Sequence, residues 1–123
     1  MNDNTLISIT LKSLPPTINH MYMTAHGRRF RTAECREYQE QVVEQLKALW
    51  NSEPPFTGRV AIHIIFTAKD KRRWDIDNRM KAIQDCLSMA GIIKDDSQID
   101  EIYIERRYTE KISTTLILKS IEE

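Results

Sequence analysis

Glycine, proline and long apolar runs are all scarce in this chain. It has 3 Gly and 4 Pro among 123 residues, too few for a collagen-like repeat or a low-complexity segment. The longest apolar stretch, residues 60–66, is far shorter than the ~18–20 residues of a membrane-spanning helix, and His63 interrupts it. The first residues also lack the basic start and apolar run of a secretory signal. We therefore expect a soluble, cytoplasmic protein with no membrane partner.

Cysteine is also rare, because only Cys35 and Cys86 are present and neither lies in a Cys-x-x-Cys motif or a Cys/His cluster. This argues against a structural zinc site and against a disulfide scaffold, so we expect two free thiols. Hydrophobic residues make up 41% of the chain and charged residues 29%, a balance typical of a folded protein. The length suits one core, and we expect residues 1–123 to form a single domain.

An excess of one charge is absent, since 18 basic residues balance 18 acidic ones. The distribution is uneven, because residues 1–81 hold 13 basic and 9 acidic residues and residues 82–123 hold 5 and 9. Charge runs of this kind are most often solvated surfaces, but the second basic run flanks two aspartates. The basic residues gather in two groups: Arg28, Arg29, Arg31 and Arg36, and Lys69, Lys71, Arg72, Arg73, Arg79 and Lys81.

Hydrophobic periodicity predicts two strands and a helix in the N-terminal half. Alternation over residues 6–11 is typical of a half-buried strand, which the following proline pair ends. From Thr32, an expected N-cap, apolar residues recur every three or four positions and predict an amphipathic helix that ends near Asn51. Residues 60–66 are apolar at nearly every position, which predicts a central strand covered on both faces. The helix stripe consists of Cys35, Tyr38, Val42, Leu46 and Leu49.

The C-terminal half predicts one helix and two strands. The helix begins near Asp75, buries a stripe from Ile76 to Ala90 and ends at Gly91. Residues 99–108 and 112–118 are rich in β-branched and aromatic residues, and the short polar stretch between them predicts a closing hairpin. The resulting order, β-α-β-α-β-β, predicts an α+β two-layer domain with a mixed β-sheet and two main helices on one face.

The residues that can carry chemistry lie at residues 71–81, where a basic loop leads into the second helix. Asp75 and Asp77 flank the core-facing Ile76, so their carboxylates can converge just outside the first turn. Paired carboxylates suit Mg²⁺, which takes oxygen ligands and commonly shares them with substrate phosphates. Lys81 lies four residues after Asp77, on the same helical face, and can offer positive charge to a phosphoryl-transfer transition state.

The same residues also have a purely structural interpretation. Aspartates at helix starts cap free N–H groups and suit the helix dipole, and Asp77 with Lys81 is an ordinary i,i+4 pair. Two further carboxylates, Asp95 and Asp96, follow Gly91. A loop there can return to the helix start if the last strands pair beside the central strand. Residue spacing alone leaves both interpretations open.

The ordered set of these motifs resembles one known family over nearly the whole chain. It resembles the RusA family of Holliday junction resolvases, which are crossover junction endodeoxyribonucleases of lambdoid prophages. The matching motifs are Pro15-Pro16-Thr17-Ile18-Asn19 with Tyr22, the basic run into Asp75-Ile76-Asp77-Asn78 with Lys81, then Ala90-Gly91 and Asp95-Asp96.

The resemblance implies a homodimer without an organic cofactor that acts in DNA recombination and repair. Such a protein binds a four-way DNA junction and, with Mg²⁺, makes paired symmetric nicks, preferably beside a CC dinucleotide. The resemblance also implies that Asp75, Asp77 and Asp96 are the essential, metal-binding acidic residues and that Lys81 is a basic residue of the active site. It is the resemblance that selects Asp96 over Asp95.

The basic groups are expected to contact DNA phosphates, with a solvated surface as the alternative. Arg28, Arg29 and Arg31 surround Gly27 in a small hairpin or a flexible loop and can follow another junction arm. The second group comprises Lys69, Lys71, Arg72, Arg73 and Arg79.

Trp74 departs from the best-known family member, which has a basic residue before the first aspartate. It can stack on an exposed base or pack against the domain, and packing is the usual role of a single Trp. Two other functions stay open: a flap or branch nuclease without true resolution, and a non-catalytic branched-DNA-binding protein whose aspartates only cap the second helix.

Overall fold

The computed structural model describes residues 4–122, and helices and strands form two layers. None of the helices in this range is long and apolar enough to cross a membrane. Cys35 and Cys86 are buried free thiols, as expected. The elements are β1 (Thr5–Leu11), η1 (Ile18–His20), β2 (Tyr22–Ala25), β3 (Arg28–Arg31), α1 (Ala33–Trp50), β4 (Val60–Ala68), η2 (Ile76–Arg79), α2 (Met80–Met89), η3 (Asp96–Gln98), β5 (Ile99–Tyr108) and β6 (Ser113–Ser120), where η marks a 3₁₀ turn.

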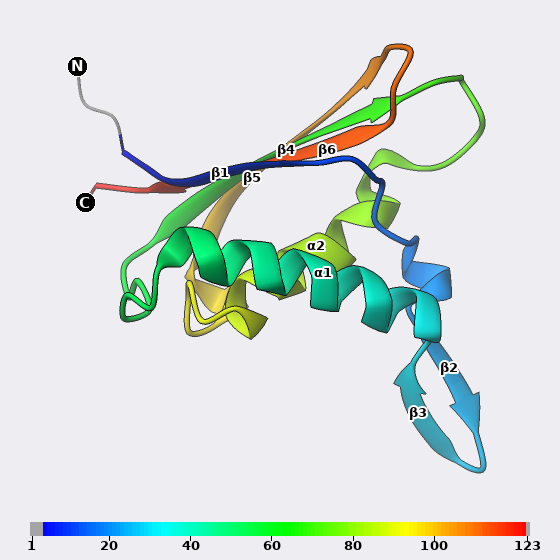
Figure 1. Cartoon of the computed structure of the whole chain (residues 1–123), viewed down its shortest axis with the longest axis horizontal. Helices are drawn as coiled ribbons and strands as arrows, with labels where there is room; N and C mark the ends of the chain where they lie inside the picture. The colour runs from blue at the N-terminus through cyan, green and yellow to red at the C-terminus, as the bar shows by residue number, and fades with distance from the viewer. Residues whose placement is uncertain (1–3, 123) are drawn as a thin grey trace.

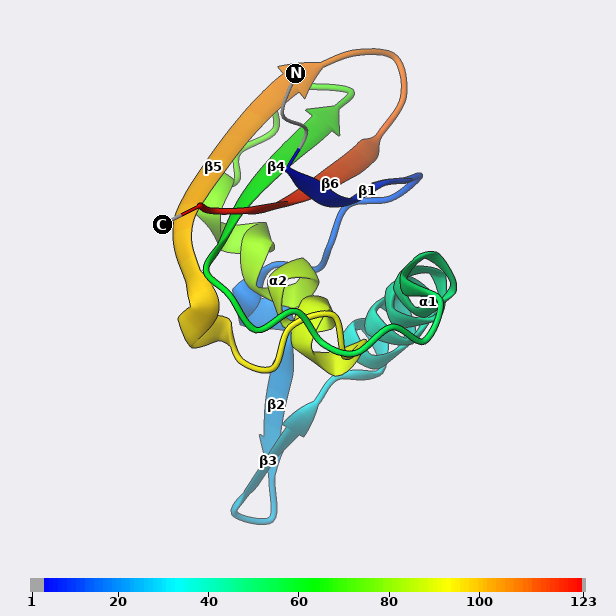
Figure 2. The same cartoon turned by 90° about the vertical axis from the view of Figure 1, so that its left-hand side faces the viewer.

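The main sheet has the strand order β1-β6-β4-β5. β4 pairs in parallel with β5, whereas the β1–β6 and β6–β4 pairs are antiparallel. A parallel pair needs a crossover connection, and α2 supplies it between β4 and β5. Both α1 and α2 lie on the same side of the sheet (Figures 1 and 2). The predicted α+β class, with a mixed sheet and two helices on one face, is therefore confirmed.

The predicted closing hairpin is wrong, because β5 and β6 lie on opposite sides of β4. The connection between them crosses the end of β4, where the Thr109 N–H donates to the Ala68 carbonyl (3.0 Å). Closeness in sequence suggested direct pairing. β4 instead takes the central place because every second side chain along it is buried, which requires neighbours on both edges.

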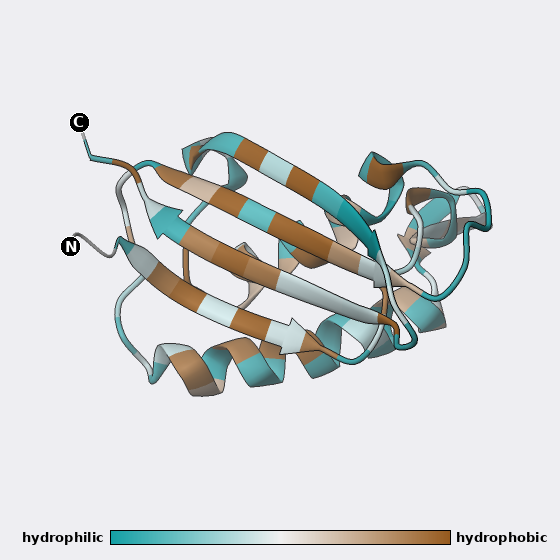
Figure 3. Cartoon of the chain, turned by 90° about the horizontal axis from the view of Figure 1, so that it is seen from above, coloured by the Kyte–Doolittle hydropathy of each residue, from teal (hydrophilic) through white to brown (hydrophobic). Residues whose placement is uncertain are grey.

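The core lies between the sheet and the two helices. Val60, Ile62, Ile64 and Phe66 point from β4 toward the helices and are fully buried. The alternate residues of β4 are only half-buried, so the expectation that both faces of this strand are covered is wrong. Figure 3 shows this second face of the sheet, which no helix covers.

Both helices begin and end close to the predicted residues. Thr32 caps α1 by accepting a hydrogen bond from the Cys35 N–H (3.1 Å). Leu49 was expected in the buried stripe but is 53% exposed, because Trp50 packs against the core at this end of the helix. The expected start of the second helix at Asp75 is a 3₁₀ turn, and α2 itself begins at Met80. Gly91 follows α2 with φ +76°, the left-handed conformation that glycine favours.

A two-stranded hairpin, β2–β3, interrupts the predicted order between β1 and α1. His26 and Gly27 form its turn and both have positive φ, as the tight two-residue turns of hairpins require. The structure therefore selects the hairpin over the flexible loop for the segment around Gly27. The hairpin projects away from the two layers (Figures 1 and 2).

Candidate active site

Asp75 and Asp77 lie in the segment that leads from the basic loop into α2. Asp75 occupies the N-cap position of η2, but its side chain makes no capping hydrogen bond. Both residues are exposed, and within residues 4–122 neither carboxylate has a hydrogen-bond or ion-pair partner. The capping interpretation therefore does not account for Asp75, whose carboxylate stays available for other contacts.

Lys81, in the first turn of α2, is the centre of an acidic cluster. Its Nζ lies 2.8 Å from Asp85 Oδ1 and 3.5 Å from Asp96 Oδ2. The hydrogen bond that Lys81 donates to Asp85 is the largest of the effects that raise the pKa of Lys81, so the ammonium group stays charged. The i,i+4 partner of Lys81 is thus Asp85 rather than Asp77, because the 3₁₀ turn before α2 changes the helical periodicity between Asp77 and Lys81.

Asp96 is a partly buried carboxylate with one unsatisfied oxygen. Its Oδ1 is buried and has no hydrogen-bond partner, while Oδ2 faces Lys81. Burial raises the pKa of Asp96, and the charge of Lys81 acts in the opposite direction. A buried carboxylate oxygen without a partner is costly, so it marks a position where another ligand is expected.

The neighbouring Asp95 has a structural role instead. Its carboxylate accepts a hydrogen bond from the Ser97 N–H (3.1 Å) and caps η3, and this contact lowers its pKa. The Gln98 side chain completes a capping box by accepting from the Asp95 N–H (3.1 Å). Of the two adjacent aspartates, Asp95 therefore holds the turn and Asp96 is left for the site.

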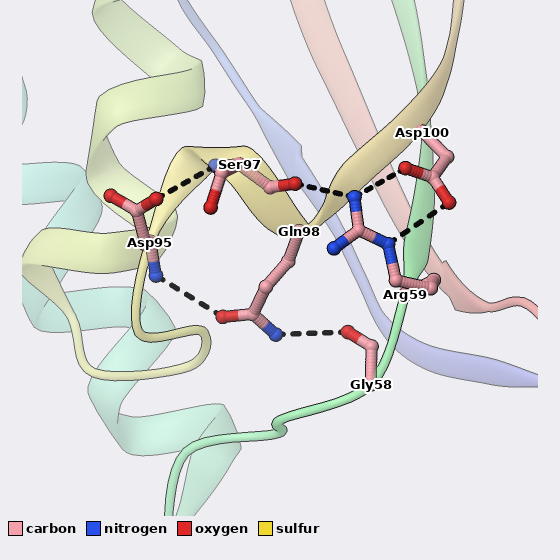
Figure 4. A network of polar contacts seen from close by, with 6 residues as sticks. All are labelled: Gly58, Arg59, Asp95, Ser97, Gln98 and Asp100. Carbon is pink, nitrogen blue, oxygen red and sulfur yellow. Dashed lines mark hydrogen bonds and ion pairs between the residues drawn. The ribbon is translucent and has the colours of Figure 1, made fainter.

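A polar network around Gln98 holds this turn against the sheet (Figure 4). The buried Gln98 amide donates to the carbonyls of Phe56 (2.8 Å) and Gly58 (2.9 Å). Arg59 donates to the Ser97 carbonyl (2.5 Å) and also pairs with Asp100. These contacts tie the turn that carries Asp96 to the start of β4 and of β5.

Asp75, Asp77 and Asp96 offer oxygen donors, the type that a hard divalent cation takes, and the unsatisfied Asp96 oxygen fits such a ligand. Between residues 4 and 122, however, no three Asp, Glu, His or Cys side chains lie close enough together to form a metal-binding group. The donor chemistry thus fits a cation, and the set of three ligands stays a prediction.

Trp74 packs against the domain, in agreement with the simpler of its two interpretations. Its ring contacts Phe66 edge to face at a centroid distance of 5.6 Å. The guanidinium groups of Arg79 and Arg106 lie 4.9 and 4.7 Å from the ring centroid. Arg106 also donates to the Trp74 carbonyl (2.7 Å). These contacts fix the backbone immediately before Asp75.

The basic loop before Asp75 is exposed, with one predicted DNA contact as an exception. The side chains of Lys69, Lys71, Arg72 and Arg73 lie at the surface. Arg79 is instead half-buried and donates to the Pro15 carbonyl (2.6 Å), and burial lowers its pKa. Arg79 therefore links the proline segment to η2, and a DNA contact by this residue stays a prediction.

The two segments of the sequence pattern meet at one open cavity of about 510 Å³. Thr17, Asn19 and His20 line it from the η1 segment, and Asp75, Asn78 and Arg73 line it from the other side. His20 is held there by a hydrogen bond between its Nδ1 and the Thr17 hydroxyl (2.7 Å). An open, polar cavity beside exposed carboxylates and a basic loop is accessible to a phosphate backbone.

Sequence reasoning missed three residues that shape the site: Asp85, Gln98 and Arg106. The i,i+4 spacing of Lys81 and Asp85 was a signal that could have found the first. The Asp-x-x-Gln spacing of a capping box could have found Gln98. Arg106 had no local signal, because only the pairing of β5 with β4 brings it to Trp74.

Carboxylates, a lysine and a basic loop around an open cavity are typical of proteins that act on nucleic-acid phosphates. Comparison with known proteins narrows this class. The family model described as Endodeoxyribonuclease RusA matches residues 13–118, so the chain belongs to the RusA endodeoxyribonuclease family.

Individual relatives agree with the family. The chain is 35% identical over 95 residues to the crossover junction endodeoxyribonuclease RusA of Escherichia coli K12, a match that covers 75% of each protein. It is 31% identical over 96 residues to the enzyme of that name from Enterobacteria phage HK97, covering 75% of this chain and 76% of the phage protein. The Aquifex aeolicus relative is 26% identical over 119 residues, covering 92% and 89% of the two chains.

Proposed function

We propose that this protein is a Mg²⁺-dependent, structure-selective endodeoxyribonuclease that resolves Holliday junctions by paired symmetric nicks. Residues 1–123 would act as one RusA-like domain in the cytoplasm. Family membership supports the reaction class. The observation that carries the assignment to a site is the contrast between two adjacent aspartates, since Asp95 caps a turn while Asp96 has a buried, unsatisfied oxygen beside Lys81.

Asp75, Asp77 and Asp96 would hold the cation through their carboxylate oxygens. When bound, Mg²⁺ lowers the pKa of a coordinated water and polarises the scissile phosphate. Lys81 stays protonated because Asp85 and Asp96 surround its ammonium group, and its charge would stabilise the phosphate oxygens in the transition state. Asp85 is in this scheme a positioning residue, because it orients Lys81.

The exposed basic loop would supply affinity for DNA phosphates that does not depend on sequence. Four residues of the loop project beside Asp75, and the one carboxylate contact among them within residues 4–122 is the Arg72–Asp70 pair (3.4 Å). Such phosphate contacts weaken steeply with salt. The contributing residues would be Lys69, Lys71, Arg72 and Arg73.

A four-way junction has near two-fold symmetry, so paired nicks require two related active sites. A homodimer supplies them, and symmetric pairs are the commonest oligomers. We therefore propose a homodimer as the active form on junction DNA.

The test is cleavage of a labelled mobile four-way junction, with linear duplex as the control substrate. Wild type should make paired, symmetric nicks in Mg²⁺ and none in EDTA. Asp77→Asn should bind the junction and fail to cut it, whereas Asp70→Asn, a matched change on the same loop, should cut normally. Binding without cutting in Mg²⁺ by wild type would contradict the proposal and leave a junction-binding protein. Unpaired cuts or preference for flaps would indicate a branch nuclease.

A further inference from the structure

The β2–β3 hairpin is a stiff, positively charged arm. Residues 22–31 contain Arg28, Arg29 and Arg31 and no Asp or Glu. The guanidinium of Arg29 stacks over the Tyr22 ring at 4.0 Å, which braces the two strands against each other. Together with the tight turn at its tip, this contact makes the hairpin a defined structure that projects from the body (Figure 2).

One face of the hairpin is attached to the body of the protein. Tyr22 and Arg31 are cross-strand partners, so their side chains lie on the same face. Tyr22 packs against the buried cluster around Met21, and Arg31 donates to the Gln39 side chain (2.8 Å). The opposite face of the hairpin is therefore turned away from the body.

That opposite face carries an apolar pair. Met23 and Phe30 are the next cross-strand partners, and strand alternation places them on the face away from Tyr22 and Arg31. They are 49% and 42% exposed. Two large apolar side chains on a projecting arm indicate a contact surface. The three arginines, with no acid among them, favour a polyanionic partner over a second copy of a chain whose net charge is zero.

We propose that Met23 and Phe30 form a wedge that inserts between bases at the branch point of junction DNA. This inference rests on the proposed function and adds the means by which the branch is recognised. Phe and Met are among the side chains that proteins insert between base steps, at the cost of unstacking them. That cost is lowest where stacking is already interrupted, as at the centre of a four-way junction. The arginines would hold the flanking phosphates.

The base of the hairpin is also connected to the active-site helix. Gln39 is buried and accepts from Arg31 with its oxygen, while its Nε2 donates to the Ala82 carbonyl (3.0 Å). Ala82 directly follows Lys81 in the first turn of α2. The wedge is thus held at a constant distance from the site, which would place the cut at a set number of nucleotides from the branch point.

The experiment uses a four-way junction with 2-aminopurine at the branch point, because the fluorescence of this base rises when it is unstacked. Wild type is added in EDTA, so that no strand is cut, at concentrations that saturate binding. Fluorescence should rise on the junction but not on a duplex with the same base. Met23→Thr/Phe30→Thr should lose most of this rise and bind the junction about tenfold more weakly. Thr is a good strand former, so the hairpin itself should persist.

Three comparisons make the result decisive. Leu49→Ser/Ile102→Thr removes two other exposed apolar side chains and should behave as wild type. Met23→Leu/Phe30→Tyr keeps a wedge and should restore the fluorescence rise. An undiminished rise in the Thr variant, or conversion of a dimer to a monomer by that variant in sedimentation, would overturn the wedge while leaving the cleavage activity of wild type intact. A wild type that neither binds nor cuts junctions would overturn the proposed function and the wedge together.

Discussion

Gln98 gives the sharpest test of how the turn that carries Asp96 is held. Its side chain accepts from the Lys94 and Asp95 N–H groups and donates to the Phe56 and Gly58 carbonyls. Gln98→Leu keeps the size of the side chain and removes all four hydrogen bonds. At about 0.5–1.5 kcal/mol for each hydrogen bond, and with water reaching the Lys94 and Asp95 groups, the free energy of unfolding should fall by about 2–4 kcal/mol.

A second buried glutamine provides the matched control. The Gln84 Oε1 is buried and has no hydrogen-bond partner, so Gln84→Leu should change the free energy of unfolding by less than about 1 kcal/mol or increase it. Urea unfolding measures both variants, and thermal unfolding should place Gln98→Leu about 10 °C below wild type. Junction cleavage by Gln98→Leu should also drop, because Asp96 loses its support. Equal costs for the two variants would refute the network argument.

The remaining predictions concern charged groups. Asp96→Asn should abolish junction cleavage without lowering the thermal midpoint, because it removes a partly buried charge, whereas Asp95→Ala should lower the midpoint by removing the cap and still cut; measuring both variants in both assays tests this. The hydrogen bond from Arg59 lowers the pKa of Asp100, so this pair stabilises the fold above the ordinary Asp pKa of about 3.9 and the effect is lost as the pH falls through the lower folded-state value. The thermal midpoints of wild type and Asp100→Asn should therefore differ at pH 6 and converge toward about pH 2–3; a gap that stays constant would exclude the linkage. Neutralising three loop residues should reduce the slope of log affinity against log salt by about 1 for each phosphate that the protein no longer binds, as binding titrations between about 50 and 200 mM salt would show, and an unchanged slope would remove the loop from the interface. These residues are Lys71, Arg72 and Arg73.

Local patterns in the sequence were sufficient for the element types. Alternation identified β1, the three-and-four spacing identified α1, and Thr32 and Gly91 marked helix ends, because each of these features depends on a few neighbouring residues. The ordered motifs around Asp75 and Asp96 were also enough to suggest the family, which the match over residues 13–118 then established. Neither conclusion required knowledge of which strands pair.

The pairing of the strands was decided only by the tertiary structure. A short polar connection between β5 and β6 favoured a hairpin, yet the most buried strand, β4, lies between them. This placement brings Arg106 of β5 to Trp74, so a residue expected either to stack on DNA or to pack is seen to pack. Long-range burial outweighs chain proximity here, and a local pattern does not record it.

The roles of neighbouring acidic residues divide in the same way. Spacing and resemblance singled out Asp75, Asp77, Asp96 and Lys81 as a set, since residue type and order are properties of the sequence. Which carboxylate caps a turn, which one contacts Lys81 and which oxygen is buried without a partner depend on how the turn before β5 packs against α2 and β4. The sequence by itself determined which groups are available for chemistry, and the folded chain decided which of them its own contacts already use, because only burial and distance distinguish a satisfied carboxylate from a free one.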